Sequence, residues 1–135
     1  GAPVGPVLVG DAEFIQRTRR LRKMLGGGMR QAGGLAAAGL YALKNNIDSL
    51  ADDHAKAAKL ADGLKDISQL TVDNERVQTN MVFIRVRPED GESLQTFMFE
   101  RGVIIGGERN VLHRDISDAD VDKVIELFRQ FYQQH

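Results

Sequence analysis

The spacing of the apolar residues changes near Leu70, and this change limits the possible fold more than any other feature of the chain. Before Leu70, apolar residues recur every three or four positions, which is the period of an α-helix with one buried face. After it they alternate, most clearly over residues 77–86, as expected of β-strands. Helices that lead into a small, mostly antiparallel sheet packed by further helices define an α/β fold.

These periods, together with the capping and turn residues between them, predict the individual elements. Asp11 is expected to cap the first helix, and Ser117 and Asp120 to form a capping box before the last one. In chain order we expect a strand over 4–9, helices over 11–23, 32–43 and 47–64, strands over 70–72 and 77–86, a short helix around 94–98, strands over 103–105 and 109–113, and a final helix from 121.

Two of these helices carry expectations about burial. The Ala- and Gly-rich helix over 32–43 is expected to be buried against another element or another subunit, because small side chains permit close helix packing. An Asn at 45 or 46 is expected to cap the next helix. On that helix the expected apolar stripe is Ile47, Leu50, His54, Ala57, Ala61 and Leu64, and the expected solvated face is Asp52, Asp53, Lys56, Lys59, Asp62 and Lys65. We interpret His54 as a partly buried histidine hydrogen-bonded to a neighbour rather than as a ligand.

Composition excludes several classes of function. The 135 residues carry a formal net charge of −1, so nothing in the overall charge favours binding to nucleic acid. The absence of cysteine excludes disulfides and thiolate chemistry. No His, Asp and Glu cluster has metal-ligand spacing, and the longest apolar run is too short to span a bilayer. With no signal peptide evident either, we expect a soluble, cytoplasmic protein.

Three consecutive glycines, Gly26 to Gly28, separate the first two expected helices and are flanked by Arg22, Lys23 and Arg30. One interpretation is a helix C-cap followed by a loop, with the cations in water. The other is an anion site, since glycine lets the backbone approach a ligand closely. The segment lacks the Lys-Ser/Thr ending of a phosphate-binding P-loop.

Arg109 is a second candidate, because it follows two glycines at the start of an expected strand. An arginine in that position can bind a carboxylate through two parallel hydrogen bonds. The alternative is an arginine on the surface of an edge strand. Serines and histidines are few and scattered, so no pair of nucleophile and base is evident.

Several segments together resemble the low-specificity L-threonine aldolases. The most specific is the run from Arg22 to Gly33, which reads RKMLGGGMRQAG. The others are residues 1–5, 35–43, 45–47, 51–55, 79–81 and 109–117. The resemblance covers nearly the whole chain but only the C-terminal part of a protein of that family.

The resemblance implies a pyridoxal-phosphate (PLP) enzyme of the aspartate-aminotransferase fold type I. Such an enzyme cleaves L-threonine or L-allo-threonine to glycine and acetaldehyde by retro-aldol chemistry. In that frame, residues 1–31 end the large PLP-binding domain, residues 32–66 are connecting helices, and residues 67–135 are the small C-terminal α/β domain. The full-length protein is then expected to be a homotetramer, a dimer of dimers.

The resemblance also implies roles for single residues. Arg109 matches the arginine that holds the substrate carboxylate, and Arg30 and Lys23 match cofactor-binding or active-site cations. The lysine that forms the imine with PLP is expected upstream of Gly1, so no catalytic residue is expected in this chain and the chain alone should be inactive. Pro6, Gly34 and Asn110 depart from the family pattern, and the turn before Arg109 is shorter than in that pattern.

Two other functions stay open at this point. One is a different PLP lyase or transaminase of the same fold type, which would act on another amino acid. The other is a non-catalytic assembly module. A module of that kind would associate with itself through the apolar surface of its first segment.

Overall fold

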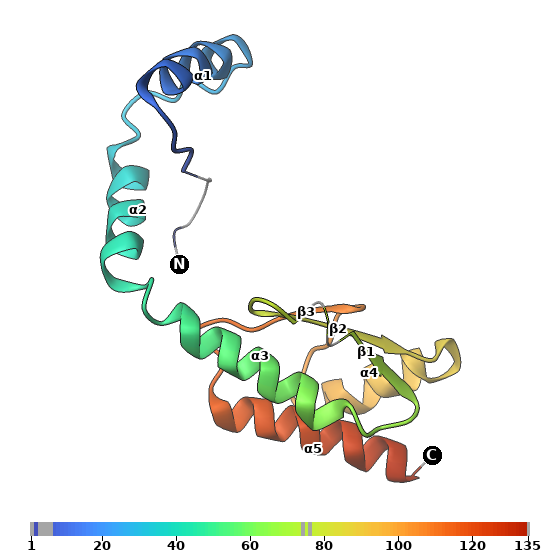
Figure 1. Cartoon of the computed structure of the whole chain (residues 1–135). Helices are drawn as coiled ribbons and strands as arrows, with labels where there is room; N and C mark the ends of the chain where they lie inside the picture. Colours follow the sequence, from blue (N-terminus) through green and yellow to red (C-terminus); the bar gives the residue numbers. More distant parts are fainter. Residues whose placement is uncertain (1, 3–6, 74, 76, 135) are drawn as a thin grey trace. The chain divides into compact units, whose positions relative to one another are not determined.

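The computed structural model describes residue 2 and residues 7–73, 75 and 77–134. The chain separates into two compact units, Gly1–Asp48 and Ser49–His135, which we describe separately (Figure 1). The expected domains at 1–31, 32–66 and 67–135 refer to a whole enzyme, and they stay a prediction. No helix in the described ranges combines the length and the apolar character that crossing a bilayer requires.

The first unit contains α1 (Ala12–Met24) and α2 (Gly33–Asn45). Asp11 caps α1 as predicted, since its side chain accepts a hydrogen bond from the Phe14 amide at 2.8 Å. Neither helix has a buried residue, so α2 is not buried against another described element of this chain, and its burial against another subunit stays a prediction. A helix of small residues needs a partner surface to be buried, and α1 does not provide it.

The strand expected over 4–9 is not formed in its described part. Val7, Leu8 and Val9 belong to no strand, and residues 3–6 lie outside the described ranges. A single strand has no partner for its backbone amides and carbonyls, so the apolar run alone does not produce a sheet. The expected Asn cap is also wrong. Asn46 ends α2, and Ser49 precedes α3 (Leu50–Leu64) without a side-chain capping bond.

The second unit is a two-layer α/β structure, as predicted. Its sheet has the order β1-β2-β3, with β1 (Leu70–Val72), β2 (Met81–Val86) and β3 (Arg109–Val111) paired antiparallel. The short η2 (Pro88–Asp90) leads into α4 (Gly91–Glu100), and α5 (Asp118–Gln134) ends the chain. The helices α3, α4 and α5 lie on one side of the sheet (Figure 1).

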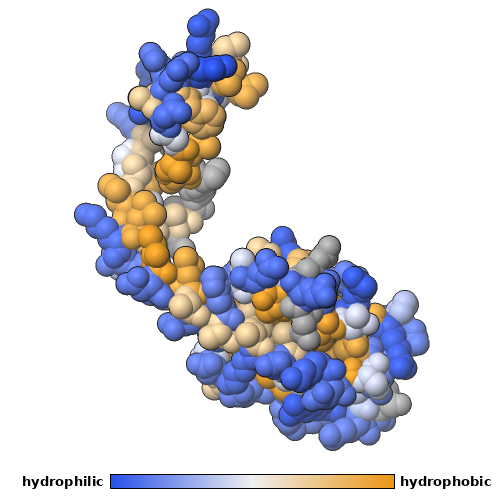
Figure 2. Space-filling model, in the orientation of Figure 1, coloured by the Kyte–Doolittle hydropathy of each residue, from blue (hydrophilic) through white to orange (hydrophobic). Residues whose placement is uncertain are grey.

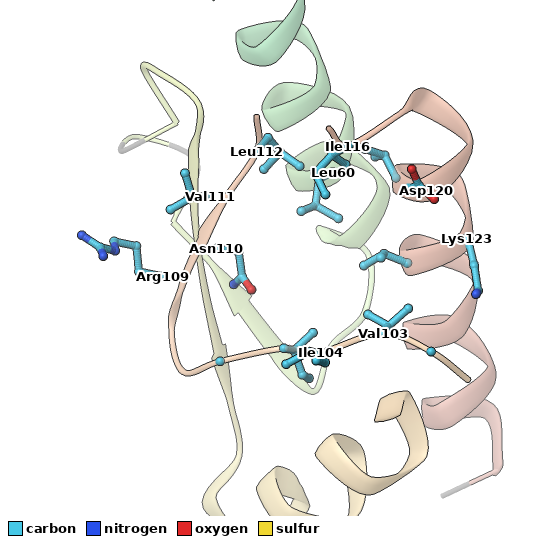
Figure 3. A pocket seen from close by; sticks show the side chains of 15 residues that line it. Leu60, Val103, Ile104, Arg109, Asn110, Val111, Leu112, Ile116, Asp120 and Lys123 are labelled. Atoms are coloured by element: carbon cyan, nitrogen blue, oxygen red, sulfur yellow. The ribbon is translucent and has the colours of Figure 1, made fainter. Parts of the chain in front are cut away.

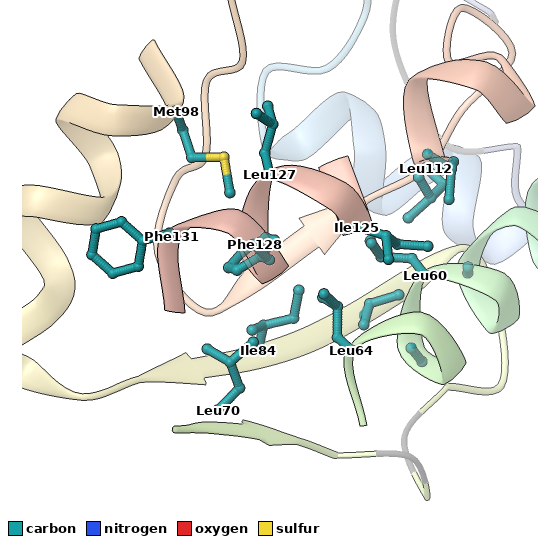
Figure 4. Packing of buried hydrophobic residues seen from close by; sticks show 14 of the residues in the cluster. Leu60, Leu64, Leu70, Ile84, Met98, Leu112, Ile125, Leu127, Phe128 and Phe131 are labelled. Atoms are coloured by element: carbon teal, nitrogen blue, oxygen red, sulfur yellow. The ribbon is translucent and has the colours of Figure 1, made fainter. Parts of the chain in front are cut away.

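One hydrophobic core lies between these helices and the sheet (Figure 4). Ile84 points into it from β2, Leu64 from α3, Met98 from α4 and Phe131 from α5, and Val82 of β2 also belongs to this core. Leu64, Val82 and Met98 are completely buried. The alternation along β2 therefore places Val82 and Ile84 under the helices, and the residues between them on the opposite face of the sheet.

The strand expected over 103–105 is also absent. Gly102 has φ +76° at the end of α4, and the Val103 amide bonds back to the Met98 carbonyl at 2.9 Å. This bond is part of a Schellman motif. It uses the Val103 amide, which is then not available to pair with a neighbouring strand. The apolar run is also not buried as a whole, since Val103 and Ile105 are half-buried and Ile104 is 85% exposed.

The buried face of α3 differs from the predicted stripe. Ala57, Ala61 and Leu64 are buried as expected, but His54 is exposed. Asp53 and Lys56, which were expected in solvent, are only 5% and 8% exposed. The buried face is thus turned toward the charged pair, because α5 and the loop before it cover that side of the helix.

Gly63 lies where α3 packs tightly against Ile125 of α5, and it generates the first prediction. A Cβ at this position would lie 2.8 Å from Cγ1 and 3.0 Å from Cγ2 of Ile125. Gly63→Ala is therefore expected to lower the free energy of unfolding by about 1–3 kcal/mol, as overpacking does elsewhere. Denaturant unfolding of the chain measures this change.

Gly39→Ala is the matched control, since a Cβ there meets nothing within 4 Å. It should favour α2 by about 1 kcal/mol of helix propensity. Ile125→Val in the Gly63→Ala background should recover part of the loss, because it removes the Cδ1 methyl that the new Cβ would meet. Equal stabilisation by both alanines would contradict the packing described for Gly63.

Candidate functional site

The glycine stretch ends α1 in a Schellman motif. Gly26 has φ +82°, the Gly27 amide bonds to the Arg22 carbonyl at 2.8 Å, and the Gly26 amide bonds to the Lys23 carbonyl at 3.2 Å. A residue with a Cβ is strained at that φ, which explains the first glycine. The C-cap interpretation is therefore right about the backbone, and it leaves the side chains of Lys23 and Arg30 for another role.

Lys23 and Arg30 are both exposed cations of the first unit. The Lys23 side chain folds over Gly28, where a Cβ would lie 2.8 Å from both Cδ and Nζ. Directly after Arg30, Gln31 adopts φ +55°, a left-handed conformation that is uncommon for a residue with a side chain. Neither cation forms a salt bridge with any residue in the described ranges. An anion would therefore meet two positive charges that no described carboxylate neutralises.

Arg109 lies in the second unit, at the start of β3. Gly107, with φ +66°, turns the chain into this strand, and the register pairs Arg109 with Phe83 of β2. The Arg109 side chain extends away from α3 and α5, on the face of the sheet that these helices leave open, whereas Leu112 points toward them (Figure 3). Arg109 is exposed, and among the described residues no carboxylate forms a salt bridge with it.

The open face of the sheet follows from the strand register. Because side chains alternate, Arg109 and Val111 share this face with their β2 partners Phe83 and Met81. Val111 is 41% exposed, and Phe83 and Met81 are half-buried. Arg109 thus presents its charge beside apolar side chains. Such an environment strengthens a hydrogen-bonded ion pair once a partner excludes water.

A hollow of about 420 Å³ is lined by residues of β3 and α5, and Arg109 and Val111 are among them (Figure 3). Its polar lining side chains include Asn110, Asp120 and Lys123. The Asp120 carboxylate already accepts hydrogen bonds from the Ser117 hydroxyl at 2.6 Å and from its amide at 2.9 Å, which lower the pKa of Asp120. These bonds are the predicted capping box, so this acid is used for structure. No group of three or more potential metal ligands gathers in the described part of the chain.

Sequence reasoning missed two side chains that hold the segment after Arg109. The Asn80 side chain donates from Nδ2 to the Leu112 carbonyl at 2.6 Å. The backbone carbonyl of Asn80 accepts a hydrogen bond from the Leu112 amide at 2.8 Å. Lys56 donates from Nζ to the carbonyls of Ile116 at 2.9 Å and His113 at 3.3 Å. An acid and a lysine three positions apart on a helix are also typical of a solvated face. The sequence therefore carries no signal that distinguishes a buried lysine at position 56 from one in solvent.

The chain is similar in sequence to known proteins. The beta-eliminating lyase family model matches residues 1–87, and the chain belongs to this family. A low-specificity L-threonine aldolase of Escherichia coli (strain K12) is 45% identical over 97% of this chain and 39% of its own length. A probable low-specificity L-threonine aldolase 2 of Arabidopsis thaliana is 44% identical over 98% of this chain and 39% of its own. The resemblance expected from the sequence is confirmed, and the chain spans about two fifths of these curated relatives.

The two roles of the glycine stretch generate the second prediction. Gly26→Ala should destabilise α1 by about 1–2 kcal/mol, because alanine is strained at positive φ. Gly28→Ala should cost much less stability and should instead displace the flexible Lys23 side chain, whose Cδ and Nζ the new Cβ would meet. Helicity and thermal unfolding of the chain measure both effects. A larger loss for Gly28→Ala than for Gly26→Ala would contradict the Schellman assignment.

Proposed function

We propose that this chain is the C-terminal part of a low-specificity L-threonine aldolase. The full enzyme would cleave L-threonine or L-allo-threonine to glycine and acetaldehyde with PLP as cofactor. The observation that carries the proposal is the 45% identity to an L-threonine aldolase over 97% of the chain. The position of Arg109, exposed on an open sheet face beside apolar side chains, supports it independently.

The residues present are suited to an anionic cofactor. PLP, when bound, withdraws the negative charge that carbon–carbon cleavage leaves on the substrate Cα. Arg30 and Lys23 would bind or neutralise its phosphate, since both are exposed cations without a salt-bridge partner in the described ranges. The lysine that links covalently to the cofactor is expected outside this chain. The chain by itself would therefore release no acetaldehyde from threonine.

Arg109 would bind the α-carboxylate of the substrate. Its planar guanidinium offers two parallel N–H donors, which match the two carboxylate oxygens and fix the orientation of the group. Fixing the carboxylate restricts rotation of the substrate about Cα and so selects which bond to Cα is broken. The apolar neighbours Phe83 and Val111 would exclude water and strengthen the pair.

A different reaction of the same family is the second candidate. A protein named alanine racemase from Cochliobolus carbonum is 32% identical over 95% of this chain. A racemase would keep the contact of Arg109 with the amino-acid carboxylate but would break the Cα–H bond rather than Cα–Cβ. Acetaldehyde release from L-threonine by the full-length protein separates these two reactions.

A subunit interface on the first unit is part of the proposal. Leu40, Tyr41 and Leu43 of α2 are 57%, 63% and 55% exposed. Figure 2 shows apolar residues gathered on the surface of this segment. Patches of this kind are covered in folded proteins by other chains or other domains. The predicted homotetramer rests on the family resemblance and the predicted cytoplasmic location on the sequence pattern, and both stay predictions.

The third prediction concerns Arg109. In the full-length protein, Arg109→Lys is expected to lower kcat/KM for L-threonine by about 10- to 100-fold, mainly through KM. Lysine keeps the charge but loses the two-point contact, and a charge-assisted hydrogen bond contributes about 1.5–3 kcal/mol. Steady-state acetaldehyde release measures the change.

Arg129→Lys is the matched control. Arg129 is an exposed arginine on α5, where it donates to the Gly63 carbonyl on the helix side of the sheet. Its replacement should leave kcat/KM within about twofold. An unchanged KM for Arg109→Lys, in an enzyme that does turn over threonine, would show that another group binds the carboxylate.

A further inference from the structure

The segment that follows Arg109 is held by a buried ammonium group. Lys56 of α3 is 8% exposed, and its Nζ contacts Asp53 Oδ1 at 2.8 Å, the Ile116 carbonyl at 2.9 Å and the His113 carbonyl at 3.3 Å. The two carbonyls accept hydrogen bonds from the ammonium, and Asp53 Oδ1 adds an ion pair that is not a hydrogen bond. Both carbonyls belong to the backbone of the loop directly after β3, nearly sixty residues away along the chain.

Burying such a group is costly unless every donor is matched. The nearby apolar residues Ala57, Leu60 and Leu64 show that this part of α3 lies in the core, where an apolar side chain at position 56 would cost nothing in desolvation. Replacing buried ion pairs by apolar residues is often neutral or stabilising. The contribution of Lys56 is therefore better sought in what it fixes than in stability.

What it fixes is the end of a short edge strand. β3 has three residues and pairs with β2 only, so backbone pairing alone specifies its register weakly. A slip by one residue would turn Arg109 from the open face to the helix face, and a slip by two would move it along β2 by about 7 Å. Lys56 holds the loop at 113–116, and Asn80 holds Leu112, so both restrict such a slip from the downstream side.

We infer that Lys56, paired with Asp53, is a positioning residue for the substrate-binding arginine. It would act through the backbone of the loop at 113–116 and the register of β3, without touching the substrate. This inference rests on the proposed function, since it assigns Lys56 an effect on the carboxylate site formed by Arg109.

The test is a double-mutant cycle in the full-length enzyme with PLP. The pair variant Asp53→Asn plus Lys56→Met removes both charges together, so that no single charge is left buried and the protein keeps its fold. If Lys56 acts through Arg109, the pair variant should raise the KM for L-threonine about 3- to 10-fold in the wild-type background. In the Arg109→Lys background it should have almost no further effect.

A second readout reports the backbone directly. Amide hydrogen exchange in the peptides covering 108–116 should become faster in the pair variant, because the Ile116 amide bonds to the His113 carbonyl within the loop that Lys56 holds, and the Leu112 amide directly before that loop bonds to the Asn80 carbonyl. Exchange in α1 should stay unchanged. Lys65→Met is the matched control, since Lys65 is an exposed lysine of the same region that pairs only with Asp62. It should alter neither KM nor exchange.

The outcomes separate the two claims. An equal rise of KM in both backgrounds, or no rise in either while Arg109→Lys itself raises KM, would overturn the role of Lys56 and leave the role of Arg109 intact. An unchanged KM for Arg109→Lys alone would instead overturn the proposed carboxylate site, and the inference about Lys56 with it.

Discussion

The packing of α3 and α5 against one face of the sheet is the interaction on which the rest of the second unit depends. Gly63 lets the two helices approach closely at Ile125, and Leu64 and Phe131 are almost completely buried between the helices and the strands. Since all the helices of this unit lie on that side, the other face of the sheet stays open. Arg109 occupies this open face because the register pairs it with Phe83, whereas the next position, Asn110, pairs with Val82 on the helix side.

Lys23 and Arg30 show how one segment of the first unit combines structure with the proposed binding role. The Schellman motif at the end of α1 uses only backbone groups and a glycine with positive φ. It therefore leaves the Lys23 and Arg30 side chains exposed. The two interpretations of this segment are compatible for that reason. The C-cap positions the Lys23 and Arg30 side chains in solvent. An anionic ligand would supply the negative charge that no described carboxylate provides.

Much of this structure was predictable because its causes are local. Helix periods, the Asp11 cap, the capping box of Ser117 and Asp120, and the alternation along β2 all depend on residues a few positions apart. The failure that matters most for the candidate site is long-range. Lys56 looked like a surface lysine because its carbonyl acceptors lie 57 and 60 residues away.

The candidate site likewise contains residues that the sequence predicts and residues that it does not. Lys23, Arg30 and Arg109 were identified from glycine-flanked cations and from family resemblance, and the structure shows all three exposed. The face that Arg109 occupies could not be read from the sequence, since it depends on the register of a three-residue strand. The residues that hold this strand from outside, Lys56 and Asn80, could not be found either, because they carry no local pattern.

The most direct test of this account is a crystal structure of the full-length protein with PLP and glycine, the product that retains the α-carboxylate. The account predicts that both glycine carboxylate oxygens accept hydrogen bonds from the Arg109 guanidinium, on the sheet face opposite α3 and α5. A carboxylate bound by another cation, with Arg109 in solvent, would contradict it.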